Sequence, residues 1–82
     1  MRSDSKIKMD IETELRSVPI VDETAIAVDV NHGDVTLSGF ADSYLSKYQA
    51  EIEVRRIRGV AAVANHIAVR PLGWSSRDLT QQ

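Results

Sequence analysis

The chain has 82 residues, no cysteine, a net charge of −2 and an apolar fraction of 43%. The absence of cysteine excludes disulfide bonds and thiolate metal sites, and so small a charge excludes a strong general attraction to nucleic acid. A chain of this length forms one domain and buries roughly 60% of the surface that its unfolded state exposes. We therefore expect a single domain of modest stability.

Residues 5–18 have the pattern of an amphipathic helix. Their apolar side chains recur at the spacing of one helical face: Ile7, Ile11, Leu15 and Val18. The Ser-Asp-Ser run at residues 3–5 offers candidate N-caps, and Pro19 is expected to stop the helix.

Two alternating segments follow, at residues 25–30 and 35–40. The Asn-His-Gly-Asp run between them tolerates positive φ, so the pattern predicts a β-hairpin. Val35 and Leu37 are expected on its buried face, with the intervening Thr36 pointing away.

A second helix is expected to begin at Asp42 or Ser43 and to end at Gly59, as the glycine that follows its C-cap. Basic residues crowd its last turn, where cations suit the helix dipole. Residues 63–70 then alternate again, and Pro71 ends this last strand.

The order helix, strand, strand, helix, strand predicts a small α+β domain. Only one face of each strand is strongly apolar, so both helices are expected on one face of a three-stranded mixed sheet. The helical crossover makes the third strand parallel to the second and antiparallel to the first. The order of the strands in the sheet stays open at this stage.

No catalytic, nucleotide or metal site is expected. Gly33 and Gly39 bracket a strand without the spacing of a phosphate loop, so we assign them to a turn and to a close approach of two backbones. A calcium loop here would need a bidentate glutamate where the chain has Phe40. His32 and His66 lack convergent metal ligands, and no serine has the setting of a nucleophile. We expect neither enzyme activity nor a cofactor.

The second helix carries two apolar stripes that cannot face the sheet equally. The first stripe consists of Ala50, Val54 and Ile57. The second stripe consists of Leu45, Tyr48 and Ile52. The second stripe is surrounded by Tyr44, Lys47, Arg55 and Arg56. If the second stripe is exposed, it forms an apolar strip with a cationic rim, which suits a membrane surface or a partner. Alternatively, the helix is wedged between the sheet and the first helix and buries both stripes.

Two further features offer contact surfaces. The outer face of the sheet is small and weakly polar, and it is either solvated or covered by a neighbouring repeat or subunit. Its residues are Ala27, Asp29, Thr36, Ser38, Ala64 and Ala68. Trp74, beyond the last strand, is either an interfacial anchor or an aromatic side chain that folds back onto the core.

Taken together, these motifs resemble the BON domain, a bacterial module. The matching residues extend from about residue 6 to 70: Asp10, Leu15, Ile26, Val28, Val30, Gly33, Val35, Thr36, Leu37, Ser38, Gly39, Lys47, Ala50, Glu51, Val54, Gly59, Val60, Val63, Asn65, Ile67 and Val69. The expected structural motif within this set is Gly33, Val35, Leu37, Gly39, Gly59, Val60 and Asn65. Each motif is short, and their order and spacing together make the resemblance specific.

The resemblance implies a role as well as a fold. BON domains occur in osmotically induced periplasmic proteins, nodulation proteins, secretins and channels. The family is described as a membrane-surface module, proposed to bind phospholipid, with no catalytic residues. Its pattern turns the Ala50 stripe inward and leaves the Leu45 stripe exposed.

BON domains often occur in tandem, and residues 75–80 resemble the start of this domain. We therefore expect an N-terminal arm at 1–5, a BON-like domain at 6–71 and a polar linker at 72–82 that leads toward a second copy. No secretory signal or transmembrane run is present. The location is expected to be cytoplasmic if Met1 is the native start, and periplasmic or in the cell envelope if the chain is an excised fragment.

Two binding hypotheses follow. The first is peripheral association with an anionic phospholipid surface, which weakens with salt. Its candidate site is Tyr44, Leu45, Lys47, Tyr48, Ile52, Arg55 and Arg56. The alternative is a protein-interaction or assembly module that uses the same strip or the outer face of the sheet and depends less on lipid charge.

Overall fold

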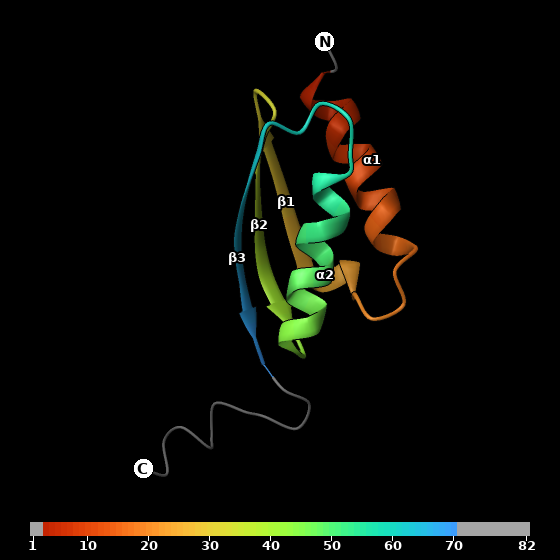
Figure 1. Cartoon of the computed structure of the whole chain (residues 1–82), viewed down its shortest axis with the longest axis vertical. Coiled ribbons are helices and arrows are strands. Elements are labelled where there is room, and N and C mark those ends of the chain that lie inside the picture. Colours follow the sequence, from red (N-terminus) through yellow and green to blue (C-terminus); the bar gives the residue numbers. More distant parts are fainter. Residues whose placement is uncertain (1–2, 71–82) are drawn as a thin grey trace.

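Two helices lie on one face of a three-stranded sheet (Figure 1). The computed structural model describes residues 3–70. The elements in chain order are α1 (Asp4–Arg16), a short 3₁₀ turn η1 (Glu23–Ala25), β1 (Ile26–Asn31), β2 (Asp34–Ala41), α2 (Tyr44–Arg55) and β3 (Ala62–Val69). This is the α+β arrangement that the order of sequence patterns predicted.

The strand β2 lies between β1 and β3. It pairs antiparallel with β1 and parallel with β3, as the crossover through α2 predicted. The hairpin turn between β1 and β2 has φ values of 52° at His32 and 83° at Gly33. Both values are typical of a tight two-residue hairpin turn, so the hairpin and the strand directions are confirmed.

The helix α1 packs its predicted apolar stripe into the core. The fully buried residues of the stripe are Ile7, Ile11 and Leu15. Ser3 caps the helix, since its hydroxyl accepts a hydrogen bond from the N–H of Lys6 at 3.2 Å. The helix ends at Arg16, before the predicted end, because the N–H groups of Ser17 and Val18 bond to carbonyls three residues back and tighten the chain.

Asp4 ties the start of α1 to the hairpin turn. Its carboxylate accepts hydrogen bonds from the backbone N–H of His32 at 2.9 Å and of Gly33 at 3.2 Å. The sequence pattern presented Asp4 only as a candidate cap in an N-terminal arm. The structure places it in the first helical turn, where it fixes one end of the hairpin against α1.

The prediction that α2 extends to Gly59 is wrong. Ser43 caps the helix as predicted, but the helix ends at Arg55. The N–H groups of Arg56 and Ile57 bond to carbonyls three residues back, which closes the last turn early. Gly59 lies in the turn that follows, with a φ of 92°.

The core lies between the inner face of the sheet and the two helices. Leu37 on the central strand is fully buried and is paired with Val28 on β1 and with Asn65 on β3. The other buried apolar residues are Ile7, Ile11, Leu15, Val21, Val28, Val35, Ala41, Ala50, Val54 and Ile67, and Val60 packs against them partly buried.

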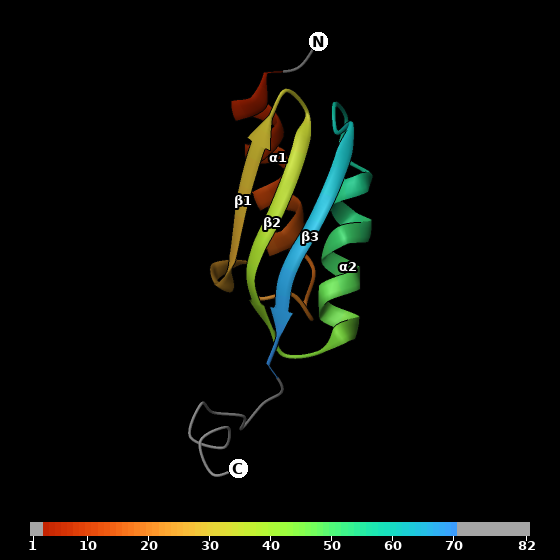
Figure 2. The same cartoon turned by 90° about the vertical axis from the view of Figure 1, so that its left-hand side faces the viewer.

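Neither helix covers the outer face of the sheet (Figure 2). Ala27, Asp29, Ala64 and Ala68 are exposed there, while Thr36 and Ser38 are half-buried. The predictions for Trp74, for the repeat-like residues 75–80 and for the linker at 72–82 lie outside the described residues.

Candidate functional site on the outward face of α2

The outward face of α2 carries four exposed apolar side chains, here named the outer strip. Their exposed fractions are 64% for Tyr44, 66% for Leu45, 55% for Tyr48 and 47% for Ile52. Ala50 and Val54, on the opposite side of the helix, are fully buried. The alternative in which α2 buries both of its stripes is therefore wrong.

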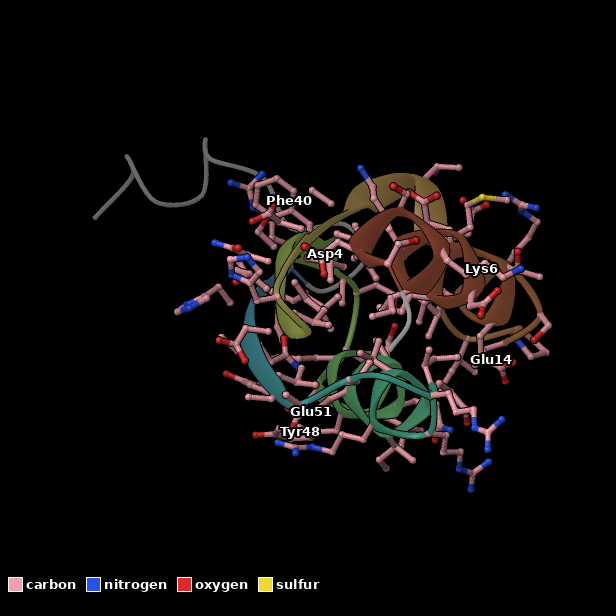
Figure 3. The ribbon with its side chains drawn as sticks, turned by 90° about the horizontal axis from the view of Figure 1, so that it is seen from above. Asp4, Lys6, Glu14, Phe40, Tyr48 and Glu51 are labelled. Carbon is pink, nitrogen blue, oxygen red and sulfur yellow. The ribbon has the colours of Figure 1, made fainter. Side chains whose placement is uncertain are left out.

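The two tyrosines of the outer strip pack against each other. The ring centroids of Tyr44 and Tyr48 are 6.3 Å apart, and the ring planes differ by 28°. Such a stacked pair is more favourable than its buried area alone implies. Figure 3 shows Tyr48 and Glu51 on the side of α2 that lies toward β3. The stacked Tyr44 and Tyr48 therefore present one continuous aromatic surface at the start of the helix.

A groove of about 490 Å³ continues the outer strip beyond the start of α2. Its lining residues are Pro19, Ile20, Val21, Asp22, Asp42, Ser43 and Leu45. Leu45 belongs to both surfaces, so the groove adjoins the outer strip, and Ile20, which is 45% exposed, adds apolar surface to its lining. Asp22 and Asp42 give the groove a negative charge. The sequence of residues 19–22 gave no indication of the groove, because this segment has no periodicity.

The cations that the sequence placed around the outer strip have acidic neighbours. Arg55 Nη2 lies 2.9 Å from Glu51 Oε2, and Arg56 Nη1 lies 3.6 Å from Glu53 Oε1. Lys47, the third predicted cation, is half-buried, and its charge helps to lower the pKa of Glu51. The structure thus brings the predicted cations to the strip, but it leaves little uncompensated positive charge there.

Asn65 joins β3 to α2 beside the outer strip. Its Nδ2 donates to the Lys47 carbonyl oxygen and to Glu51 Oε1, both at 3.1 Å. Its Oδ1 accepts a hydrogen bond from the N–H of Ile67 at 3.2 Å. The sequence marked Asn65 as a motif residue without a role, and its two hydrogen bonds to Lys47 and Glu51 show that it holds α2 beside β3.

Glu51 stabilises this arrangement in its ionised form. Hydrogen bonds from Arg55 and then from Asn65 lower the pKa of Glu51 from its usual value of 4.5. Because the folded-state pKa lies below the unfolded-state pKa, the stabilisation is fully present above the unfolded-state value and is lost as the pH falls through the folded-state value. Solvent screens the ion pair, so we expect it to contribute about 0.5 kcal/mol.

Neither histidine belongs to a metal-binding cluster. His32 lies in the hairpin turn and His66 on the outer face of the sheet, and both are exposed. Within residues 3–70, no group of three or more His, Asp or Glu side chains is placed to hold a metal ion. In the same part of the chain, neither helix has the length and apolar character needed to cross a bilayer.

The solved structures that share this fold include two of CdsD, a structural protein of the type III secretion system of Chlamydia trachomatis. The first contains its C-terminal domain; the TM-score is 0.68 at 18% identity, over 83% of this chain and 34% of that chain. The second has a TM-score of 0.72 at 20% identity, over 96% of this chain and 37% of that chain. At such identities the likeness concerns the fold, and this chain spans about a third of the length of those chains.

No curated protein sequence matches the chain. The model of the BON domain family, in contrast, matches residues 3–71. This match includes both helices, the three strands and every residue of the predicted structural motif. It therefore confirms the resemblance on which the sequence prediction relied. The chain belongs to the BON domain family.

Proposed function

We propose that the chain is a non-catalytic binding module that docks a partner protein on the outer strip of α2. The observation that carries this proposal is the exposure of four large apolar side chains on one helical face, each between 47% and 66% exposed. Neighbouring exposed side chains of this size typically mark an interaction site. A partner that covers them gains free energy from burying their apolar surface.

The charges around the outer strip favour a protein over an anionic lipid surface. A peripheral membrane site combines apolar area with an excess of positive charge. Here both arginines are paired with glutamates of the same helix. The groove beside Leu45 adds the carboxylates of Asp22 and Asp42, which repel anionic headgroups. A partner protein can instead place hydrogen-bond donors or cations against these carboxylates.

The solved relatives are compatible with this role. CdsD is a structural protein of a secretion system, so the same fold occurs in a protein whose role is structural. A domain with such a role needs a specific contact surface and no catalytic groups. The outer strip and its groove supply a surface of this kind.

Association with an anionic phospholipid surface is the second candidate. It is favoured by the Tyr44–Tyr48 pair, since tyrosine suits the membrane–water interface. The side chains of Arg55 and Arg56 are 56% and 70% exposed, so they could exchange their carboxylate partners for headgroups.

A vesicle titration separates the two candidates. The ¹⁵N-labelled chain is mixed with phosphatidylglycerol or phosphatidylcholine vesicles at low and at high salt, and its amide resonances are recorded. We expect the resonances of residues 44–56 to stay unchanged in all four mixtures. Broadening of these resonances with the anionic vesicles alone, reversed by salt, would support the lipid candidate and count against the protein candidate.

A further inference from the structure

The free edge of β3 is a second feature, which the docking surface on α2 does not use. β3 has one neighbour, β2, and lies at the margin of the sheet (Figure 2). Its eight residues include no charged residue, no proline and no glycine. Natural edge strands usually carry such residues, because they prevent unwanted pairing. The other edge strand, β1, has six residues and carries Asp29 within it.

The direction of the backbone groups on β3 follows from its hydrogen bonds. The N–H of Arg70 donates to the Ala41 carbonyl on β2 at 2.6 Å, and the register is continuous from Ala62 to Val69, so the even-numbered residues of β3 direct their N–H and C=O groups toward β2. The residues that direct these groups toward the free edge are Val63, Asn65, Ile67 and Val69. Ile67 agrees with this alternation, because its N–H donates to the Asn65 side chain and not to β2.

The position of α2 decides what fits at this edge. Figure 2 shows α2 extending past β3, and the hydrogen bonds of Asn65 to Lys47 and Glu51 place the helix beside that strand. The inner face of one added strand would lie against the side of α2 that carries Tyr48 and Glu51 (Figure 3). A second copy that paired antiparallel with β3 would bring its own α2 to the same face of the sheet. Neighbouring strands are about 4.8 Å apart, whereas packed helices need about 8–10 Å, so the two helices would collide.

We propose that the free edge of β3 binds one extended segment of a partner protein as an added strand. The backbone groups of Val63 and Val69 supply hydrogen bonds near the two ends of the site. Asn65 covers the N–H of Ile67 in the free chain and releases it to the incoming strand. Strand addition is a common form of peptide recognition, in which main-chain hydrogen bonds supply the affinity.

The side chains around the edge define the segment that it accepts. On the outer face of the sheet, β3 presents exposed residues that are mostly alanine, so small or polar side chains suit this side of the segment. On the inner face, Tyr48 favours an apolar side chain. The segment therefore alternates small or polar residues with apolar ones. The site shares Tyr48 with the outer strip, but its hydrogen-bonding groups belong to the backbone of β3.

The test uses the ¹⁵N-labelled 82-residue chain and a synthetic peptide of alternating threonine and valine with a lysine at each end. We expect solvent exchange of the Val63 and Val69 amides to slow about tenfold at saturating peptide, because each N–H gains an acceptor. The control peptide is N-methylated at every residue, so it has no backbone N–H to donate and its methyl groups block pairing along both of its edges. Equal slowing by both peptides, or slowing by neither, would overturn the proposal.

A pair of variants tests the same contact from the side of the protein. Val63→Pro removes an N–H that points to the free edge, while the bonds to β2 remain. Val63→Ala also shortens the side chain but keeps the N–H, so it is the matched control. We expect Val63→Pro to weaken peptide binding about tenfold relative to Val63→Ala. Equal affinities would contradict the proposal, and the N-methylated peptide decides the question if Val63→Pro does not fold.

The same exchange measurement distinguishes a partner segment at this edge from a second copy of the chain. Slowing of the Val69 amide without peptide, increasing with protein concentration, would assign the edge to self-association and overturn the proposal. Exchange that is independent of protein concentration is the expected result.

Discussion

Replacing Gly39 with alanine should destabilise the fold by about 4 kcal/mol, the sum of about 1–3 kcal/mol for a non-glycine residue in this conformation and about 1–3 kcal/mol for overpacking. Gly39 has a φ of 112°, which residues with a side chain rarely adopt. An added Cβ would overlap the carbonyl oxygen of Ala25 and lie 3.2 Å from the Cα of Ile26. An 82-residue domain has a total stability of roughly 4–12 kcal/mol, so the substitution should remove between about a third and all of it.

Urea denaturation followed by circular dichroism measures this effect, with Gly33→Ala as the comparison. Gly33 also has a positive φ, but its added Cβ would lie 2.9 Å from the carbonyl oxygen of Gly59, which is a smaller overlap. We expect Gly33→Ala to lose about half as much stability as Gly39→Ala. Equal stabilities of the two variants would contradict the claim that the close approach of the β1 backbone to Gly39 leaves no room for a side chain there.

Truncating Leu37 to alanine should cost about 3 kcal/mol of unfolding free energy. Leu37 is fully buried at the centre of β2, under both helices, and the sheet cannot collapse onto the space it leaves. The same denaturation experiment measures the loss as a lower urea midpoint.

Thr36→Ala is the control for this substitution. Thr36 is adjacent in sequence but lies on the outer face of the same strand, where it is half-buried. We expect it to cost less than about 1 kcal/mol, since only strand propensity and partial packing change. A loss as large as that of Leu37→Ala would mean that the outer face carries as much of the stability as the core.

The local patterns of the chain determine most of the fold. The i, i+4 spacing of Ile7, Ile11 and Leu15 predicted the buried face of α1, and alternation predicted which face of β2 is buried. The glycines at 33 and 39 were predicted from the conformations that turns and close contacts need. These features depend on neighbouring residues, which is why the sequence alone sufficed for them.

Features that depend on distant residues could not be predicted in the same way. The end of α2 was misplaced because the last turn closes early, at the hydrogen bonds of Arg56 and Ile57, and Ile57 packs on the core beyond the helix. The central position of β2 is determined by pairing between whole strands. At the candidate site, helical spacing predicted two apolar stripes on the second helix, and the resemblance to the family implied which stripe is exposed. The bridge from Asn65 to α2 could not be predicted in this way, because it joins residues that are 14 and 18 positions apart in the chain.

The charge of the candidate site was also only partly predictable from the sequence. Spacing brought Arg55 and Arg56 to the rim of the outer strip, and it suggested an anionic partner. Their carboxylate neighbours lie three and four residues back on the same helix, so the pairs were within reach of sequence reasoning. The acidic groove could not be predicted from the sequence, because Asp22 and Asp42 line the same groove only in the folded chain.

Site-specific photo-crosslinking in the cells that produce the chain tests the central claim most directly. A photoreactive residue replaces Tyr48 on the outer strip, or Thr13 on the exposed surface of α1 as the control. The account predicts discrete protein adducts from position 48 that are absent from position 13 and are lost when Ile52→Ser is added. Equal adducts from both positions, or adducts that persist with Ile52→Ser, would contradict the claim that the outer strip docks a partner protein.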